Sequence, residues 1–424
     1  MVDVQVRDEL AELVELAEIL GDGAVRAVYQ PIVDLATGRP VAYEALARGP
    51  VGSPLEGPDR LFAVARRAGR LGELDWACRL AALRGALEAG MTRSVSLFVN
   101  VEPDATHAPP TGRAFAAVRE ASGVLDVVVE VTERSLVVAP AELLGMVSAV
   151  RATGWGIALD DVGAEMASLA LMPFLQPDVI KLDLSLVQER PSADVAAIVS
   201  AVNAQSERTG ALVLAEGIEH HAHLTAARAM GASVGQGWLF GRPGPLPADV
   251  GRNGGGGVTV WPVPAAASRS VVAAAAGGRP LSRSTKPLLL EMSWHLERQA
   301  SQLGAPGVVL SAFQTDERFT PATRGRYAAL ARDAAFVGAL GVGMDEQPAP
   351  GVRGGHLWRD DPLVDEWAVA VVGPHFAAAL AATDLHDRGP DAERRFDYVV
   401  TYDRDRVLAV AASLMARIAR HPSP

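Results

Sequence analysis

The sequence predicts an α/β protein with a modified (β/α)8 barrel whose first two strands form an antiparallel hairpin, followed by a smaller α/β domain. Three observations predict it. The chain has 424 residues, well above the ~150 residues typical of one domain. In its first part, eight short apolar runs of β type alternate with longer Ala-rich segments of helical period, which is the pattern of a closed barrel. A stretch rich in Gly, Ala, Ser and Pro at 252–283 then precedes a shorter second part.

The composition describes a folded protein and argues against several classes of function. Hydrophobic residues make up 49% of the chain and charged residues 21%, which is enough for large cores. The net charge is -11 with no cluster of Lys and Arg, so a nucleic acid polymer is a poor partner. The single cysteine, Cys78, excludes an intramolecular disulfide. No apolar stretch reaches the ~18 residues of a membrane helix, so we expect no membrane contact and a cytoplasmic location.

Residues 1–23 are predicted as an amphipathic N-terminal helix, and residues 24–248 as the barrel. Acidic residues interrupt the apolar ones in the first segment, which argues against a signal peptide. Helices are predicted between most strands, at Pro58–Gly69, Glu73–Ala89, Pro140–Thr153 and Ser192–Thr209. The predicted strands are Val25–Val33, Val41–Ala47, Val95–Asn100, Val127–Val131, Ile157–Asp160, Val179–Asp183, Leu212–Glu216 and a weak one at Ser233–Gly237.

The first connection departs from the barrel pattern. Residues 34–40 contain Thr37-Gly38 and are too few for a crossover between parallel strands, which takes a dozen residues or more. The first two strands are therefore expected to pair as an antiparallel hairpin.

Polar side chains stand at or near the ends of the predicted strands, where a barrel builds its active site. Each has an ordinary explanation when taken alone; an aspartate pair after a strand could cap the next helix. Together, converging carboxylates would repel one another unless cations neutralised them. Oxygen ligands without Cys or His favour Mg²⁺ or Mn²⁺, and a pair of such ions suits in-line displacement at a phosphodiester. In chain order these residues are Gln30, Glu44, Asn100, Glu130, Asp160, Asp161, Lys181, Asp183, Glu216 and Gln236.

An ordered series of motifs resembles the EAL-domain cyclic di-GMP phosphodiesterases and covers about Ala24 to Pro247. The resemblance implies hydrolysis of cyclic di-GMP to linear pGpG, with two Mg²⁺ or Mn²⁺ ions in each active site. The series reads Tyr29-Gln30-Pro31-Ile32, Glu44-Ala45-Leu46-Ala47-Arg48, Val99-Asn100-Val101, Glu130-Val131-Thr132-Glu133, Asp160-Asp161-Val162-Gly163, Ile180-Lys181-Leu182-Asp183, Ala215-Glu216-Gly217-Ile218-Glu219 and Gly235-Gln236-Gly237.

The resemblance also implies roles for individual residues. Lys181 would orient or deprotonate the attacking water, and Gln236 and Glu216 would act beside it. The nucleotide would contact Gln30, Leu46, Arg48 and Asp183. One metal ion would be held by Glu44, Asn100, Glu130 and Asp160, and a second by Asp160 and Asp161 with Glu216 nearby.

The loop after the paired aspartates departs from the family. The family has Phe, Gly, Thr, Gly, Tyr, Ser and Ser after the two Asp residues, whereas this chain has Val, Gly, Ala, Glu, Met, Ala and Ser at 162–168. In the family this loop helps to position the second metal ion and to form the dimer contact. Acidic residues that match Glu133 and Glu219 hold the loop in place. Turnover and oligomeric state, including a homodimer, are therefore left open.

Residues 249–285 are predicted as a flexible linker and residues 286–418 as a small α/β domain. Its motifs Val371-Val372-Gly373-Pro374-His375-Phe376 and 396–403 resemble the DICT sensory domain, which implies regulation by an unknown signal; dimerisation without a ligand is the alternative. Its expected helices are 286–302, 323–340, 375–382 and a final one, and its expected strands are 308–313, 367–372 and 396–402.

The leading hypothesis is thus a two-metal cyclic di-GMP phosphodiesterase under control of a C-terminal domain. The alternative is a catalytically weak cyclic di-GMP receptor that uses the same cleft.

Overall fold

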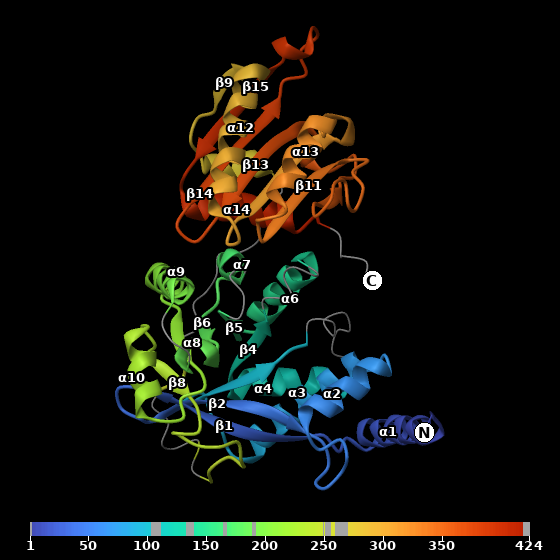
Figure 1. The fold of residues 1–424 in the computed structure, drawn as a ribbon, viewed down its shortest axis with the longest axis vertical. Coiled ribbons are helices and arrows are strands. Elements are labelled where there is room, and N and C mark those ends of the chain that lie inside the picture. Colours follow the sequence, from blue (N-terminus) through green and yellow to red (C-terminus); the bar gives the residue numbers. More distant parts are fainter. Residues whose placement is uncertain are drawn as a thin grey trace.

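A closed eight-stranded barrel and a seven-stranded sheet form the two parts of the molecule (Figure 1). The computed structural model describes residues 2–102, 112–132, 140–163, 168–188, 192–248, 250, 256–258 and 270–418. In Figure 1 the barrel occupies the lower half and the sheet the upper half, with α7 between them. The predicted fold class is confirmed.

The barrel follows the predicted alternation, and every predicted barrel strand is present. Its strands are β1 (Arg26–Asp34), β2 (Pro40–Arg48), β3 (Ser96–Asn100), β4 (Asp126–Thr132), β5 (Gly156–Val162), β6 (Val179–Leu182), β7 (Leu212–Ala215) and β8 (Val234–Gln236). The helices of this part are α1 (Val2–Asp22), α2 (Pro58–Arg67), α3 (Leu71–Glu88), α4 (Arg113–Val124), α6 (Pro140–Ala152), α7 (Ser168–Leu175), α8 (Leu184–Gln188), α9 (Ala193–Thr209) and α10 (His221–Ala229).

The predicted antiparallel hairpin is confirmed, and it closes the barrel. β1 runs antiparallel to both β2 and β8, while the other neighbouring strands are parallel. Asp34 stabilises the tight turn, because its Oδ1 accepts hydrogen bonds from the backbone N–H and the hydroxyl of Thr37, both at 2.7 Å. The register sets Gln30 opposite Glu44, in the middle of the strands rather than at their ends.

Alternating side chains of the barrel strands build two apolar layers. One set, including Phe98, Val128 and Leu214, fills the barrel interior. The other set packs outward against the surrounding helices. The N-terminal helix α1 joins α2 and α3 in a separate cluster, where the nearly buried Glu12 forms ion pairs with Arg60 and Arg67.

The second part is a mixed sheet in the order β12-β11-β10-β13-β14-β15-β9. α12 and α13 cover one face, and α11 and α14 cover the other. The strands are β9 (Ser282–Thr285), β10 (Val308–Thr315), β11 (Phe336–Val342), β12 (Arg353–His356), β13 (Glu366–Val372), β14 (Ala377–Asp384) and β15 (Arg395–Thr401). The helices are α11 (Val271–Ala276), α12 (Lys286–Leu303), α13 (Pro321–Leu330) and α14 (Arg404–Met415), with 3-10 turns η2 (Asp316–Arg318), η3 (Pro362–Asp365) and η4 (Asp391–Glu393).

Two helices expected in this part are wrong. The expected helix 323–340 is α13 followed by strand β11, and the expected helix 375–382 is strand β14. Both strands are buried along almost their whole length; β14 is Ala-rich, and β11 follows directly on an Ala-rich stretch at 328–335. A strand buried on both faces shows no period-two alternation of apolar residues, and alanine favours helices. Hydrophobic periodicity and helix propensity therefore both indicated helices where the structure has strands.

Residues 270–285 contain regular structure, whereas the whole of 249–285 was predicted as linker; residues 249, 251–255 and 259–269 lie outside the described residues. α11 and β9 lie within 270–285, and Val271, Val272 and Ala275 of α11 are buried in the hydrophobic core. Residues 270–285 therefore belong to the second part, since a short Ala/Val helix contributes to its core.

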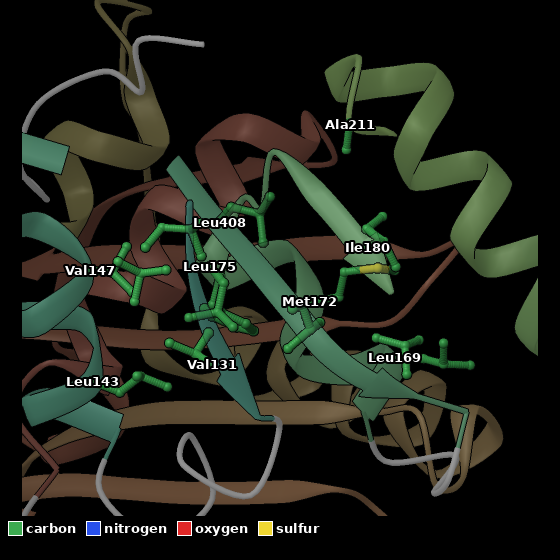
Figure 2. Packing of buried hydrophobic residues seen from close by; sticks show 14 of the residues in the cluster. Val131, Leu143, Val147, Leu169, Met172, Leu175, Ile180, Ala211 and Leu408 are labelled. Atoms are coloured by element: carbon green, nitrogen blue, oxygen red, sulfur yellow. The ribbon is translucent and has the colours of Figure 1, made fainter. Parts of the chain in front are cut away.

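The two parts share one buried cluster at their junction. α14 of the second part packs against α7 of the barrel. Leu408 of α14 belongs to the same buried cluster as Leu175 of α7 and Val147 of α6 (Figure 2). The second part is thus docked on the helix that follows β5.

Candidate active site

An acidic cluster surrounds one buried lysine inside the barrel. The Nζ atom of Lys181 on β6 lies 2.6 Å from Glu130 Oε1, 2.9 Å from Asp160 Oδ1, 2.9 Å from Glu216 Oε1 and 3.8 Å from Glu44 Oε2. The lysine side chain is 1% exposed. Strands β2, β4 and β5 thus carry three of the carboxylates, and the fourth follows β7 directly. All four converge on the ammonium of Lys181 on β6.

The burial of these charges shifts their pKa values. Burial, with the neighbouring charge of Glu44 second, raises the pKa of Glu130 well above its usual value. Burial raises the pKa of Glu216 to about 8. For Lys181, burial alone would lower the pKa, but the four carboxylates outweigh it and raise the pKa well above its usual value. The cluster therefore holds more carboxyl groups than its one ammonium can balance, and the raised pKa values are the consequence.

Asp160 and Asp161 both reach the cluster because the backbone of β5 is irregular. Consecutive residues of a regular strand point to opposite faces. The pairing of β5 with β6 shifts between Leu159 and Val162, and Asp161 has a left-handed φ of 57°. A bulge of this kind re-aims a side chain. As a result, one carboxylate oxygen from each of Asp160, Asp161 and Glu216 lies within 4.8 Å of the others.

Side-chain amides line the side of the cluster formed by β1, β3 and β8. Glu44 accepts hydrogen bonds from Asn100 Nδ2 at 3.1 Å and from Gln236 Nε2 at 2.7 Å. Gln236 Nε2 also lies 3.0 Å from Gln30 Oε1, and Gln30 donates to the Gly241 carbonyl at 3.1 Å. The antiparallel pairing of β1 with β2 and β8 places Gln30 opposite Glu44 and near Gln236, and the pairing of β2 with β3 brings Asn100 to Glu44.

The donor set fits divalent cations. Both oxygens of Glu130 are buried and, apart from the ion pair with Lys181, have no hydrogen-bond partner among the described residues. Gln236 Oε1 is likewise buried and without a partner in the described part of the chain. Unsatisfied carboxylate and amide oxygens beside excess negative charge are the hard ligands that Mg²⁺ and Mn²⁺ prefer.

The remaining predicted site residues lie at the rim or outside the described residues. Leu46 and Arg48 follow Glu44 at alternate positions of β2, so they share its face; both are half-buried, and Arg48 Nη1 donates to the Ala47 carbonyl at 2.7 Å. Asp183 accepts a hydrogen bond from the Ser185 backbone at 2.8 Å, and Glu219 is exposed. Glu133 and loop residues 164–167 lie outside the described residues.

Two features of the site escaped sequence reasoning. Trp238 lies two residues after Gln236, is 53% exposed and has the Arg242 guanidinium 3.8 Å above its ring; an aromatic residue beside a motif was the available signal. Gly217 has a φ of 64°, and a Cβ there would lie 2.5 Å from Leu184 Cβ. Only glycine therefore fits directly after Glu216. The motif contains this glycine, but the steric reason for it is visible only in the structure.

The fold and the site define a barrel protein with a buried acidic cluster around one lysine inside the barrel. Residues 14–243, more than half of the chain, match the family described as EAL domain. The chain belongs to the EAL domain family. Residues 270–385 match the DICT domain, described as a sensory domain in diguanylate cyclases and two-component systems.

Named relatives share the barrel part. The cyclic di-GMP phosphodiesterase NbdA of Pseudomonas aeruginosa is 32% identical over 253 residues, which are 58% of this chain and 32% of the relative. The cyclic di-GMP phosphodiesterase RocR of the same organism is 31% identical over 258 residues, or 57% of this chain and 64% of the relative. The chain thus spans less than two thirds of either.

Solved structures of similar barrels include BlrP1 of Klebsiella pneumoniae in a complex with manganese and cyclic di-GMP. That structure has a TM-score of 0.46 and 30% identity, covering 52% of this chain and 56% of its own. In the described part of the present chain, none of the helices combines the length and apolar character that a membrane crossing requires.

Proposed function

We propose that this chain hydrolyses cyclic di-GMP to linear pGpG with two divalent cations, and that its second domain modulates the reaction. The observation that carries the proposal is the convergence of Glu44, Glu130, Asp160 and Glu216 around one lysine in the barrel, with Asp161 beside the last two. The relatives named as cyclic di-GMP phosphodiesterases support the choice of substrate.

The cluster offers ligands for both cations. Glu44, Asn100, Glu130 and Asp160 would hold one, and Asp160, Asp161 and Glu216 the other. Such cations, when bound, supply an activated water and stabilise charge on the phosphoryl oxygens.

The chain's own residues position the reactants. Lys181 would orient the attacking water through a charge-assisted hydrogen bond. Gln236, already fastened to Glu44 and Gln30, would help to place that water. Arg48 would engage a phosphate through its planar donor fork. Gln30, Leu46 and Asp183 would contact the nucleotide, and the exposed ring of Trp238 offers a face on which a guanine base could stack.

The alternative is a cyclic di-GMP receptor with weak turnover in the same cleft. The altered sequence at 162–168 favours this alternative, whereas the presence of every expected cation ligand favours the enzyme. The two are separated by turnover, because both predict nucleotide binding.

The decisive experiment incubates the purified full-length chain with cyclic di-GMP and Mg²⁺ or Mn²⁺ and measures pGpG by chromatography. We expect pGpG with the native chain and none with Glu44→Gln, which keeps the shape of the side chain and removes its charge. Asp59→Asn, an exposed change on α2, is the control. Unchanged pGpG production by folded Glu44→Gln would refute the two-metal proposal, and nucleotide binding without any pGpG would establish the receptor.

Lys181→Ala tests the role of the lysine. We expect turnover to fall by orders of magnitude while cyclic di-GMP affinity changes little, because an oriented water matters only for the chemical step. Calorimetry measures the affinity and chromatography the rate. A parallel loss of binding would make Lys181 a substrate-holding residue.

A further inference from the structure

The second part of the molecule contains a cavity of about 540 Å³ that is separate from the barrel site. It lies between α12 and α13, above β10 and β13, on the sheet face opposite to α14. Its volume falls within the ~300–1,000 Å³ range of small-molecule sites. Neither the phosphodiesterase proposal nor the docking of the two parts uses it.

Aromatic side chains form much of the wall of this cavity. Only 5% of the chain is aromatic, yet Trp294, Phe313, Trp367 and Phe396 all line it. The rings of Trp367 and Phe396 meet edge to face with centroids 5.8 Å apart. Flat apolar faces gathered in this way favour a flat, ring-shaped occupant.

Two nearly buried polar side chains belong to the cavity lining. Ser293 of α12 is 3% exposed, and its Oγ has no hydrogen-bond partner among the described residues. Gln314 of β10 is 5% exposed and lines the same cavity. Buried polar groups in proteins are nearly always satisfied. A hydroxyl and an amide together offer donors and acceptors to the edge of an occupant.

The backbone of β10 carries Gln314 in an unusual conformation. Gln314 has a left-handed φ of 66°, and the pairing of β10 with β11 shifts between Ala312 and Thr315. The same combination of a bulge and a left-handed residue re-aims Asp161 in the barrel. Strained residues of this kind persist where a side chain must be presented to a site.

The charged residues of the lining balance one another. Arg326 Nε lies 2.7 Å from Glu297 Oε2, and Lys286 forms an ion pair with Asp391. The other two charged lining residues, Glu317 and Arg318, have opposite signs. The cavity therefore offers no excess charge, which favours an uncharged occupant over a phosphate or a carboxylate.

We propose that this cavity binds one uncharged, planar heteroaromatic molecule of about nucleoside or flavin-ring size. Its ring lies against the aromatic wall, and its donor and acceptor edge meets Ser293 and Gln314. The second part is then a small-molecule sensor, and its ligand binds on the sheet face opposite to the barrel.

Adenosine, guanosine and riboflavin serve as probes, because each is uncharged and carries a planar heterocycle with a polar edge. The full-length chain is titrated with each probe by calorimetry, without cyclic di-GMP or metal. We expect at least one probe to saturate one site per chain at micromolar concentration. Gln314→Gly, which tolerates the left-handed backbone, and Ser293→Ala should each weaken binding by about tenfold, the worth of one hydrogen bond.

Two further measurements separate binding from a structural role. Ser293→Ala removes a hydroxyl with no partner, so its Tm without probe should equal or exceed that of the native chain. Ser301→Ala, on the same helix but outside this cavity, loses only a hydroxyl that donates to the Arg298 carbonyl and should leave probe binding unchanged. Absence of saturable binding for all three probes at millimolar concentration overturns the proposal. So does binding that is equal in the native chain and both cavity variants.

Discussion

Asp161 owes its place in the acidic cluster to its backbone. Asparagine and aspartate tolerate left-handed φ better than other non-glycine residues, so this position accepts an acid where a branched side chain would be strained. The motif therefore needs an aspartate for two reasons, one electrostatic and one conformational.

Asp161→Asn separates these two reasons. The amide keeps the left-handed backbone but loses the charge, so we expect unchanged Tm without metal and Mn²⁺ affinity of one site lowered by on the order of 100-fold. Titration calorimetry of the full-length chain measures both sites. Two sites of unchanged affinity would show that Asp161 is not a ligand.

Cys78 is the single cysteine of the chain and reports on the packing of α3. Burial, with the nearby charge of Asp75 second, raises the pKa of the Cys78 thiol to about 12. Thiolate is the reactive form, so alkylation by iodoacetamide at pH 8 should be on the order of 1,000-fold slower in the native chain than in guanidinium chloride. Mass spectrometry follows the rate. Equal rates in both conditions would contradict the packing around this thiol.

At the level of elements, close backbone contacts decide where the site residues lie. Gly237 follows Gln236 at the end of β8, and a Cβ there would lie 2.1 Å from the Ile218 carbonyl oxygen. The loop after β7 and the end of β8 therefore touch through backbone alone, which holds Gln236 against Glu44 and Gln30.

Gly237→Ala should disturb this contact. The added methyl has no room, so we expect a loss of about 1–3 kcal/mol in the free energy of unfolding and a larger relative loss of turnover. Denaturant unfolding and pGpG production measure the two effects. Gly244→Ala is the matched control, because the nearest atom to its Cβ is 3.9 Å away. If both variants behaved alike, the contact with Ile218 would not matter.

The β1–β2 hairpin and strands β11 and β14 show what the prediction of an element depends on. The hairpin could be predicted because a seven-residue connection containing Thr-Gly excludes a crossover, and this constraint is local. β11 and β14 could not, because their conformation depends on neighbours far along the chain that bury both faces. Because β14 was not predicted, the expected sheet lacked the strand that pairs with both β13 and β15.

In the whole molecule, the two parts share a buried apolar junction. α14 docks on α7, and α7 follows the bulged end of β5 that carries Asp160 and Asp161. A change in the position of the second part would therefore act first on the helix that follows two proposed cation ligands. The domain arrangement supplies a physical route for modulation.

Leu408→Asp tests this junction. Leu408 is 9% exposed within the shared cluster, and a charge there cannot stay buried without a partner. We expect the native chain to unfold in one calorimetric transition and Leu408→Asp to unfold in two, because the shared core couples the parts. Leu288→Asp, at a leucine that is 48% exposed, is the control and should keep one transition. A single transition in Leu408→Asp would show that the junction does not couple the parts.

The sequence by itself determined the barrel, its reversed first strand and the residues of the acidic cluster, because period, loop length and motif order are local properties of the chain. Tertiary structure alone decided how the second sheet is built, because β11 and β14 are buried on both faces and carry no local signal that separates strand from helix. It also decided that Asp160 and Asp161 face one point, since this needs the bulge against β6, and that Ser293 and Gln314 meet in one cavity. Residues from α12 and β10 become neighbours only when the helix packs on the sheet, and no spacing in the sequence records that contact.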